Sequence, residues 1–239
     1  MSLRVWLPLN GTLENQGLDS ATTISTAAVF DDSGKIGKYL SYSTDTNSRS
    51  IVYNVPNLAT MLANGKKYSL ACWIKIIETT GNRFIVKLGT NSCGLWWGNN
   101  NPRLVWNEND NGKRSATAIA SDYINWHHVV TVVDKSTSNT IKLTHYVDGV
   151  LSDMAGQTFD STGMAQPEGT TITIAPYKAL LNDVRLYDHA LSAMEVKQIS
   201  QGLILHYPLN NNGWGNNNLG LDTVGERTFK NSTLHYNLA

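Results

Sequence analysis

Alternating apolar and polar side chains run through most of this chain. In residues 68–76, YSLACWIKI, every second residue from Tyr68 to Ile76 is apolar, and Trp73 falls on the opposite face. A period of two indicates a strand with one face in a core. The same kind of pattern predicts strands at residues 3–10, 83–89, 92–98, 103–107, 126–134, 141–151, 170–175 and 180–188. Many strands at short intervals, with turn signals between them, predict an all-β sandwich or barrel.

One short helix is predicted near the end of this series of strands. Ser192 can act as its N-cap, and Glu195 can complete a capping box. Leu191 and Val196 have the spacing of a hydrophobic staple, and Gly202 is a natural helix stop. The helix therefore marks a boundary close to residue 202.

The first strand pattern recurs after that boundary. The chain reads LRVWLPLN at 3–10 and LILHYPLN at 203–210, and NQGLDS at 15–20 is matched by NLGLDT at 218–223. Two matches in the same order indicate a repeated unit. We expect one domain at 1–202, followed at 203–239 by the start of a second, incomplete module or a C-terminal extension. The alternative is that the matches do not mark a repeat, because a strand ending in Pro-Leu-Asn is common.

Composition narrows the classes of function. The formal net charge is zero and 16% of the residues are charged, which disfavours a nucleic-acid partner because that needs a clustered basic surface. No apolar run approaches the roughly 18 residues of a membrane span, and no signal peptide is recognisable at the N-terminus. Cys72 and Cys93 form neither a disulfide framework nor a metal cluster.

Several segments, taken in order, resemble a known family. The sequence WLPLNGTLENQGL is followed by GKIGKYL, YSLACWIK, WHHVVTVVD, KLTHYVDGVL and NDVRLYDHALSAMEV. Together they resemble the concanavalin A-like, laminin-G-type jelly roll that is found in many bacterial and phage proteins, over about residues 3–202. The resemblance implies two antiparallel sheets packed face to face, with the first strand pairing near the last, to which the residues add the one short C-terminal helix.

The continuation GLILHYPLN is similar to the joint between modules in phage and prophage tail-associated proteins. That similarity implies a protein made in the bacterial cytoplasm and built into the virion. Its implied partners are other virion or repeat modules, and a homo-oligomer is an open alternative. No cofactor is required by this interpretation. Relatives often hold one structural calcium ion near the paired terminal strands, and the oxygen donors that match here are Asn10, Asp31, Asp32 and Asp183.

An enzymatic function is disfavoured by the carboxylates. Glycosidases of this fold usually carry the pattern Glu-x-Asp-x-x-Glu on one strand, since hydrolysis needs two carboxylates beside the scissile bond. Here Glu108-Asn109-Asp110 is followed by Lys113 at the third acidic position. His127 and His128 are neighbours on a strand, so their rings point to opposite faces and cannot share a metal ion. We therefore expect a protein that is not an enzyme.

A binding site is predicted around Trp96. The alternation in residues 93–98 places Cys93, Leu95 and Trp97 on the core face and Trp96 on the other face, between Gly94 and Gly98. A tryptophan flanked by glycines is a plausible platform for a sugar ring, because the indole stands clear of its neighbours. The predicted ligand-binding set on that face is Trp96, Trp73, Lys87, Arg103, Asn99, Asn100 and Asn101.

These observations predict a non-catalytic module that binds carbohydrate or a bacterial cell-surface ligand within a phage tail-associated protein. An alternative stays open at this point. Trp73 and Trp96 can simply cover the second face of a sheet with their amphipathic rings. The domain would then be a structural spacer or assembly domain of the virion without a ligand.

Overall fold

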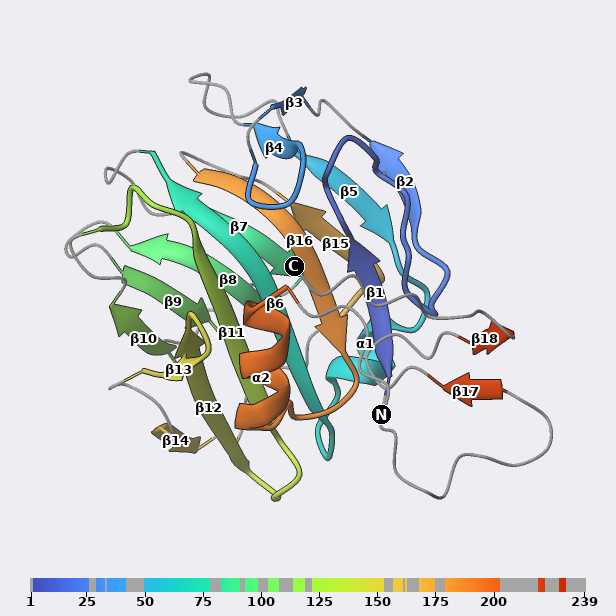
Figure 1. Ribbon diagram of the computed structural model, residues 1–239. Coiled ribbons are helices and arrows are strands. Elements are labelled where there is room, and N and C mark those ends of the chain that lie inside the picture. The colour runs from blue at the N-terminus through green and yellow to red at the C-terminus, as the bar shows by residue number, and fades with distance from the viewer. Residues whose placement is uncertain are drawn as a thin grey trace.

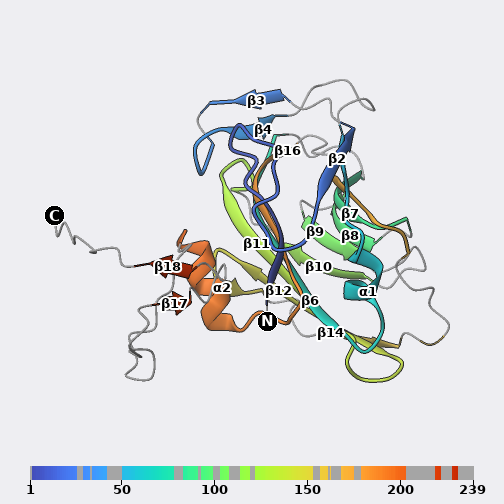
Figure 2. The same cartoon turned by 90° about the vertical axis from the view of Figure 1, so that its right-hand side faces the viewer.

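The computed structural model describes residues 2–25, 29–32, 34–41, 50–77, 83–90, 93–98, 103–107, 114–118, 122–152, 157–160, 162, 168–174, 179–202, 219–221 and 228–230. Most of them form two antiparallel sheets packed face to face, as Figure 1 and the view turned by 90° in Figure 2 show. The expected all-β, two-sheet antiparallel sandwich is therefore confirmed.

Sheet A contains nine strands. Its path is β13-β12-β11-β6-β16-β4-β3, with β1 paired to β16 and β14 paired to β12. The bounds are β1 Leu3–Leu7, β3 Val29–Asp31, β4 Tyr39–Ser41, β6 Lys67–Ile76, β11 His127–Asp134, β12 Thr140–Val147, β13 Val150–Leu151, β14 Gln157–Asp160 and β16 Ala179–Tyr187. This sheet lies toward the viewer in Figure 1.

Sheet B lies behind it and contains seven strands in the order β10-β9-β8-β7-β15-β5-β2. The bounds are β2 Thr22–Ser25, β5 Ile51–Asn54, β7 Arg83–Leu88, β8 Cys93–Gly98, β9 Arg103–Asn107, β10 Arg114–Ala118 and β15 Thr171–Ile174. Sequence periodicity did not indicate β2 to β5, β10 or β14, which have at most five residues each.

The first strand and the last strand of the sandwich are neighbours. β1 runs antiparallel to β16, with Leu7 opposite Val184 and Trp6 opposite Arg185. Residues 15–19 then fold back along β1, since the Asn15 amide accepts a hydrogen bond from the backbone N–H of Trp6 at 2.7 Å. The expected pairing of the terminal strands is confirmed.

The core between the sheets is built from the alternating positions. On β6 the residues facing it are Tyr68, Leu70, Cys72, Ile74 and Ile76, as the alternation predicts. Trp106 of β9 is fully buried there, with its ring centroid 6.2 Å from that of Tyr68. Cys72 and Cys93 are both buried and unbridged, so each packs as a small apolar side chain.

A helix covers the outer face of sheet A (Figures 1 and 2). This helix, α2 (Ala193–Ser200), begins after Ser192 with a complete capping box, and Gly202 follows it with a positive φ of 77°. Leu191, Val196 and Ile199 pack with residues of β6, β11 and β12 in a second apolar cluster. The predicted helix and its signals are confirmed, while the five-residue helix α1 (Leu58–Leu62) was not foreseen.

A β-bulge interrupts the alternation of β7. Strict alternation over residues 83–89 would place Phe84 in the core and Ile85 outside it. The register of β7 against β8 shifts between Phe84 and Val86, so that Ile85 and Val86 both enter the core. Phe84 consequently turns to the outer face of sheet B, because a bulge adds one residue to one strand and changes the faces of those before it.

A third, separate sheet pairs β17 (Leu219–Leu221) with β18 (Thr228–Lys230). The remaining residues of 203–239 lie outside the described part of the chain. The division into a domain at 1–202 and a following segment at 203–239 stays a prediction.

Candidate functional site: the aromatic outer face of sheet B

Two aromatic rings lie side by side on the outer face of sheet B. Trp96 of β8 is directly opposite Phe84 of β7, with ring centroids 5.9 Å apart and planes tilted by 41°. Val105 of β9 is opposite Trp96 on the other side. Both rings are half-buried, so each keeps part of its surface toward solvent. We call Phe84, Lys87, Trp96 and Val105 the aromatic face.

Lys87 supplies the charge of the aromatic face. Its ammonium nitrogen lies 5.9 Å from the centroid of the Phe84 ring, at the outer limit of a cation–π contact. The residue opposite Lys87 on β8 is Gly94, which has a φ of 143°. A Cβ on Gly94 would meet the carbonyl oxygen of Val86 at 2.1 Å, so only glycine is tolerated there. No β8 side chain therefore stands opposite Lys87.

The prediction of Trp96 and Lys87 on one sheet face agrees with this geometry, and Phe84 is the member that the sequence reasoning missed. The sequence does carry a signal for the bulge: Ile85 and Val86 are adjacent apolar residues, and a regular strand would place one of them outside the core. Arg103 pairs with Gly98 in the same sheet, although its side chain lies outside the described part of the structure. Asn99, Asn100 and Asn101 also lie outside the described residues.

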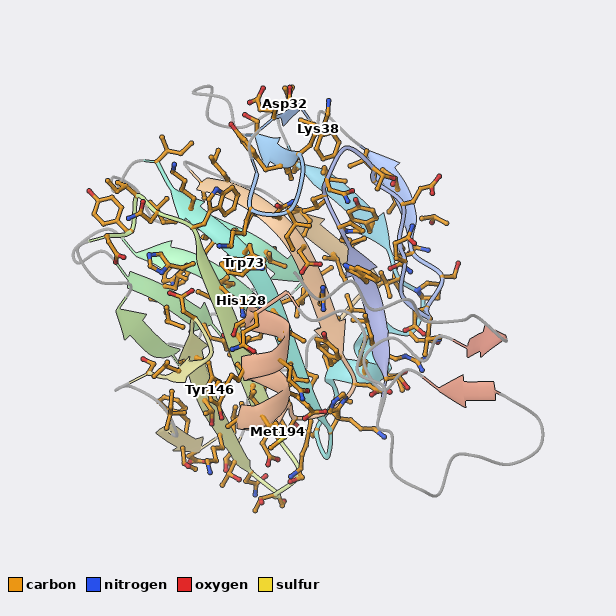
Figure 3. All side chains as sticks on the ribbon, in the orientation of Figure 1. Asp32, Lys38, Trp73, His128, Tyr146 and Met194 are labelled. Carbon is orange, nitrogen blue, oxygen red and sulfur yellow. The ribbon has the colours of Figure 1, made fainter. Side chains whose placement is uncertain are left out.

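The prediction that Trp73 lies on the same sheet face as Trp96 is wrong. It lies on the outer face of its strand, as predicted, but that strand is β6 of sheet A, so the sandwich separates Trp73 from Trp96. Trp73 is only 6% exposed. Its ring lies beside that of His128 (Figure 3), with the two centroids 5.2 Å apart, and the Lys35 ammonium lies 4.6 Å from the centroid of the Trp73 ring. Alternation determines the face of a strand but not the sheet to which the strand belongs.

Asp183 was expected to bind calcium, and the structure gives its carboxylate other partners. Both oxygens contact the guanidinium of Arg185 at 2.9 Å, and the Trp6 indole N–H donates to Oδ1 at 2.6 Å. Arg185 is 1% exposed and lies 5.0 Å from the Trp6 ring. Burial alone would lower the pKa of the Arg185 guanidinium. The Asp183 carboxylate beside it has the opposite effect, and the pKa is raised above its usual value. The group is a satisfied, buried ion pair.

The other expected calcium ligands are exposed. Asp32 lies 3.6 Å from the Lys38 ammonium (Figure 3), and Asp31 interacts with Tyr39, whose pKa is raised by burial and by that carboxylate. Asn10 is a third exposed donor. Within the described residues, no group of three or more His, Cys, Asp or Glu side chains is arranged to hold a metal ion. Calcium binding stays a prediction.

The two adjacent histidines have different environments, as the strand geometry predicts. His127 Nδ1 lies 2.7 Å from Asp148 Oδ2, and its Nε2 lies 3.2 Å from the Asp122 carbonyl. The hydrogen bond to Asp148 raises the pKa of His127 although burial opposes this. Because both ring nitrogens are occupied, His127 is poorly placed to act as a general base.

Membrane insertion through a helix receives no support from the described part of the chain, which contains no helix long and apolar enough to cross a bilayer.

Comparison with known proteins agrees with this architecture. The model of the concanavalin A-like lectin/glucanases superfamily, of laminin-G type, matches residues 45–197. A search of curated proteins finds no match.

Solved structures with a similar fold include receptor-binding domains of neurotoxins. The botulinum neurotoxin serotype D binding domain has a TM-score of 0.63 at 16% sequence identity, covering 86% of this chain and 52% of that one. The receptor binding domain of the mosaic serotype C/D neurotoxin has a TM-score of 0.64 at 14% identity, with coverages of 86% and 52%. The serotype G binding domain has a TM-score of 0.61 at 14% sequence identity, covering 86% of this chain and 53% of that one. This chain thus spans about half the length of these structures, and at such identity the likeness concerns the fold.

The matched residues run from just before β5 to the middle of α2 and cover well over half of the chain, including most strands of both sheets. The two-sheet sandwich and this match lead to one conclusion: the chain belongs to the concanavalin A-like lectin/glucanases superfamily.

Proposed function

We propose that the chain is a non-catalytic binding module that takes a glycan or another bacterial cell-surface ligand on the aromatic face. The observation that carries the proposal is the pair of half-exposed rings, Phe84 and Trp96, with Lys87 beside them. Aromatic rings bind the C–H faces of sugars, and a neighbouring ammonium group donates hydrogen bonds to hydroxyl or carboxylate oxygens.

The similar structures add support of a general kind, since they are binding domains and receptor-binding domains of neurotoxins. Fold alone does not specify a ligand, so the argument rests on the residues of the aromatic face.

We further propose that the protein is associated with a phage or prophage tail and is present in the virion. The echo of 3–10 at 203–210 supports an array of similar modules, because repeated weak sites gain affinity through avidity. Its partners would then include neighbouring modules or further copies of the chain. Mass spectrometry of purified virions tests the location, and light scattering of the purified protein tests self-association.

Binding is tested with a glycan array that compares the wild-type chain with Trp96→Ala. We expect the wild type to bind a restricted set of glycans and Trp96→Ala to lose at least about tenfold in affinity, because we take a sugar ring on an indole to contribute as much as a nucleobase stacked on an aromatic ring, on the order of 1–3 kcal/mol. Trp96→Phe keeps a ring and should retain part of the binding.

Met194→Ala is the matched control, because Met194 is 71% exposed on α2, which covers the opposite sheet. Circular dichroism of all variants checks the fold. A wild-type chain that binds no glycan or bacterial surface would contradict the proposal. It would favour a spacer or assembly domain instead, a role that the half-buried state of Trp96 also fits.

A further inference from the structure

The strands of sheet B contain positive charges without negative ones. None of its seven strands, all of which the structure describes, contains Asp or Glu, while four of their positions are Lys or Arg. Those positions are Arg83, Lys87, Arg103 and Arg114. The whole chain has 19 residues of each sign, so the excess of positive charge is a property of sheet B and not of the composition.

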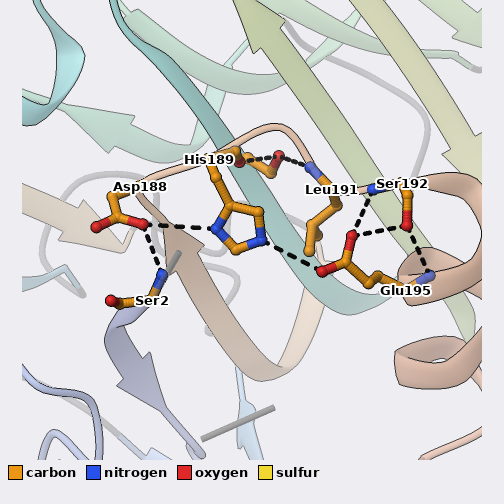
Figure 4. A network of polar contacts seen from close by, with 7 residues as sticks. Ser2, Asp188, His189, Leu191, Ser192 and Glu195 are labelled. Carbon is orange, nitrogen blue, oxygen red and sulfur yellow. Dashed lines mark hydrogen bonds and ion pairs between the residues drawn. The ribbon is translucent and has the colours of Figure 1, made fainter. Parts of the chain in front are cut away.

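The strands of sheet A contain both signs in nearly equal number. Their five Lys or Arg and four Asp residues are Arg4, Lys67, Lys75, Lys142, Arg185, Asp31, Asp134, Asp160 and Asp183. Two more acids lie beside this sheet, where His189 is 3.5 Å from the carboxylates of both Asp188 and Glu195 (Figure 4). The distribution of charge therefore favours an anionic ligand at sheet B and not at sheet A.

Arg103 occupies a position on the outer face of sheet B. On its strand, β9, the core residues are Leu104 and Trp106. Successive residues of a strand alternate between the two faces, so Arg103 and Val105 are outer positions. Val105 is opposite Trp96. Arg103 is consequently one outer position away from the row of Trp96, about 7 Å along the strand direction.

Lys87 and Arg114 share an outer row on the other side of Trp96. Lys87 is opposite Gly94, and Gly94 is opposite Asn107. Asn107 is in turn opposite Arg114 on the edge strand β10. Directly opposite residues lie on the same face of a sheet. Since Gly94 precedes Trp96 by two residues, the indole has basic positions in the outer rows on both sides of it.

The positive charge of Lys87 lacks a counter-ion. Its side chain is half-buried, and within the described residues its ammonium group makes no ion pair, its contact being the Phe84 ring. On sheet A, by contrast, the Lys67 ammonium lies 2.8 Å from the Asp134 carboxylate. A partly desolvated charge without a partner is unfavourable, and an anionic group on a ligand would provide that partner.

We propose that the aromatic face binds an anionic glycan, a chain of sugar units that carry carboxylate or sulfate groups. This inference rests on the proposed function and specifies its ligand class. A sugar ring packs on Trp96, and an acidic group of the same chain accepts hydrogen bonds from the Lys87 ammonium. Arg103 and Arg114 add positive potential in the rows on either side. Charge-assisted hydrogen bonds are stronger than neutral ones, so the acidic group gives a preference over neutral glycans.

The test is isothermal titration calorimetry of the whole chain with pairs of polymers that differ in charge. One pair is polygalacturonate and its methyl ester, and the other is dextran sulfate and dextran. We expect the charged member of at least one pair to bind at least about tenfold more tightly than the neutral member. The pair that shows the preference identifies the acidic group as carboxylate or sulfate. The preference should shrink from about 0.01 M to about 0.15 M salt, because the Debye length falls from about 30 Å to about 8 Å.

Lys87→Gln should remove most of this preference, because it deletes the charge beside the aromatic rings. Lys142→Gln is the matched control, since it removes the same charge from an exposed position on β12 of sheet A and should keep the preference. Polyacrylate, a polyanion without sugar rings, should bind more weakly than the preferred glycan. Circular dichroism of both variants checks the fold.

The outcomes separate this inference from the proposed function. Equal binding of the charged and neutral members of both pairs overturns the inference, and so does polyacrylate binding as tight as that of the charged glycan. A preference that Lys142→Gln reduces as much as Lys87→Gln overturns it as well. Binding of neutral glycans that depends on Trp96 would still support the proposed function in each of these cases. A chain that binds no glycan at all would contradict both.

Discussion

At the scale of single residues, His127 and His128 are neighbours whose proton affinities change in opposite directions. Burial is the main cause that lowers the pKa of His128 from 6.5 to about 3, and the positive Arg185 nearby lowers it further. The hydrogen bond that the His127 ring donates to the Asp148 carboxylate raises the pKa of His127. Asp148 itself has a lowered pKa, because its hydrogen bonds to His127 and to the His128 backbone outweigh the effect of burial.

The signs of these shifts predict how stability depends on pH. In the unfolded chain His128 binds a proton below about pH 6.5, whereas in the folded chain it does so only near pH 3, so stability is lost as the pH falls through this window. The contribution of Asp148 is lost at the acidic end of the same range. His127 acts in the opposite sense, since its contribution is present below pH 6.5 and lost as the pH rises through its raised pKa.

Thermal melts of the wild type and of His128→Phe between pH 4 and pH 8 check this expectation. The melting temperature of the wild type should fall on acidification below about pH 6.5, and the slope should be shallower in His128→Phe. Equal slopes in the two proteins would show that His128 is not the group responsible.

At the scale of elements, the α2 capping box should contribute measurably to stability. The Ser192 hydroxyl accepts from the Glu195 N–H at 3.3 Å, and the Glu195 carboxylate accepts from the Ser192 N–H at 2.7 Å. Ser192→Ala should cost about 1 kcal/mol in the free energy of unfolding, as the loss of an N-cap usually does. Chemical denaturation measures it, with Met194→Ala as the control in the same helix. If Ser192→Ala left the midpoint of chemical denaturation unchanged, packing alone would stabilise α2.

Much of the element pattern could be predicted from sequence, for identifiable reasons. Long strands such as β6 and β11 alternate over many residues, and α2 has both a capping box and a stop. The strands that were missed have few residues in which to show a period, and the bulge in β7 breaks the period where Phe84 turns outward. Strand partners are set by contacts distant in sequence, which is why Trp73 was placed beside Trp96 although their strands belong to different sheets.

At the scale of the whole molecule, the structure shows which contacts the first copy of the repeated motif makes. Asn15, Gly17 and Asp19 hold the loop against β1, through an amide bridge, a close backbone approach and an ion pair with Arg4. The second copy of the motif keeps the corresponding Asn218, Gly220 and Asp222 but has Ile204 where the first has Arg4. Residues 219–221 pair with 228–230 in the structure, and the other residues of the second copy lie outside the described part of the chain.

If residues 203–239 belong to another module, their removal should leave the sandwich intact. The chain shortened to residues 1–202 should melt within about 2 °C of the full chain, a difference below about 1 kcal/mol for a domain of this size. Differential scanning calorimetry measures the change. A substantially lower melting temperature for the shortened chain would mean that 203–239 is an integral part of the first sandwich, and the repeat interpretation would be wrong.

The central claim is that the aromatic face binds the ligand. Chemical-shift mapping with the strongest binder from the glycan array tests it most directly. We predict that the Trp96 indole N–H and the amides of residues 84–87 and 94–96 shift on titration of the wild type, and that the backbone-amide changes are absent in Trp96→Ala. A ligand that binds while these signals stay in place would contradict the account.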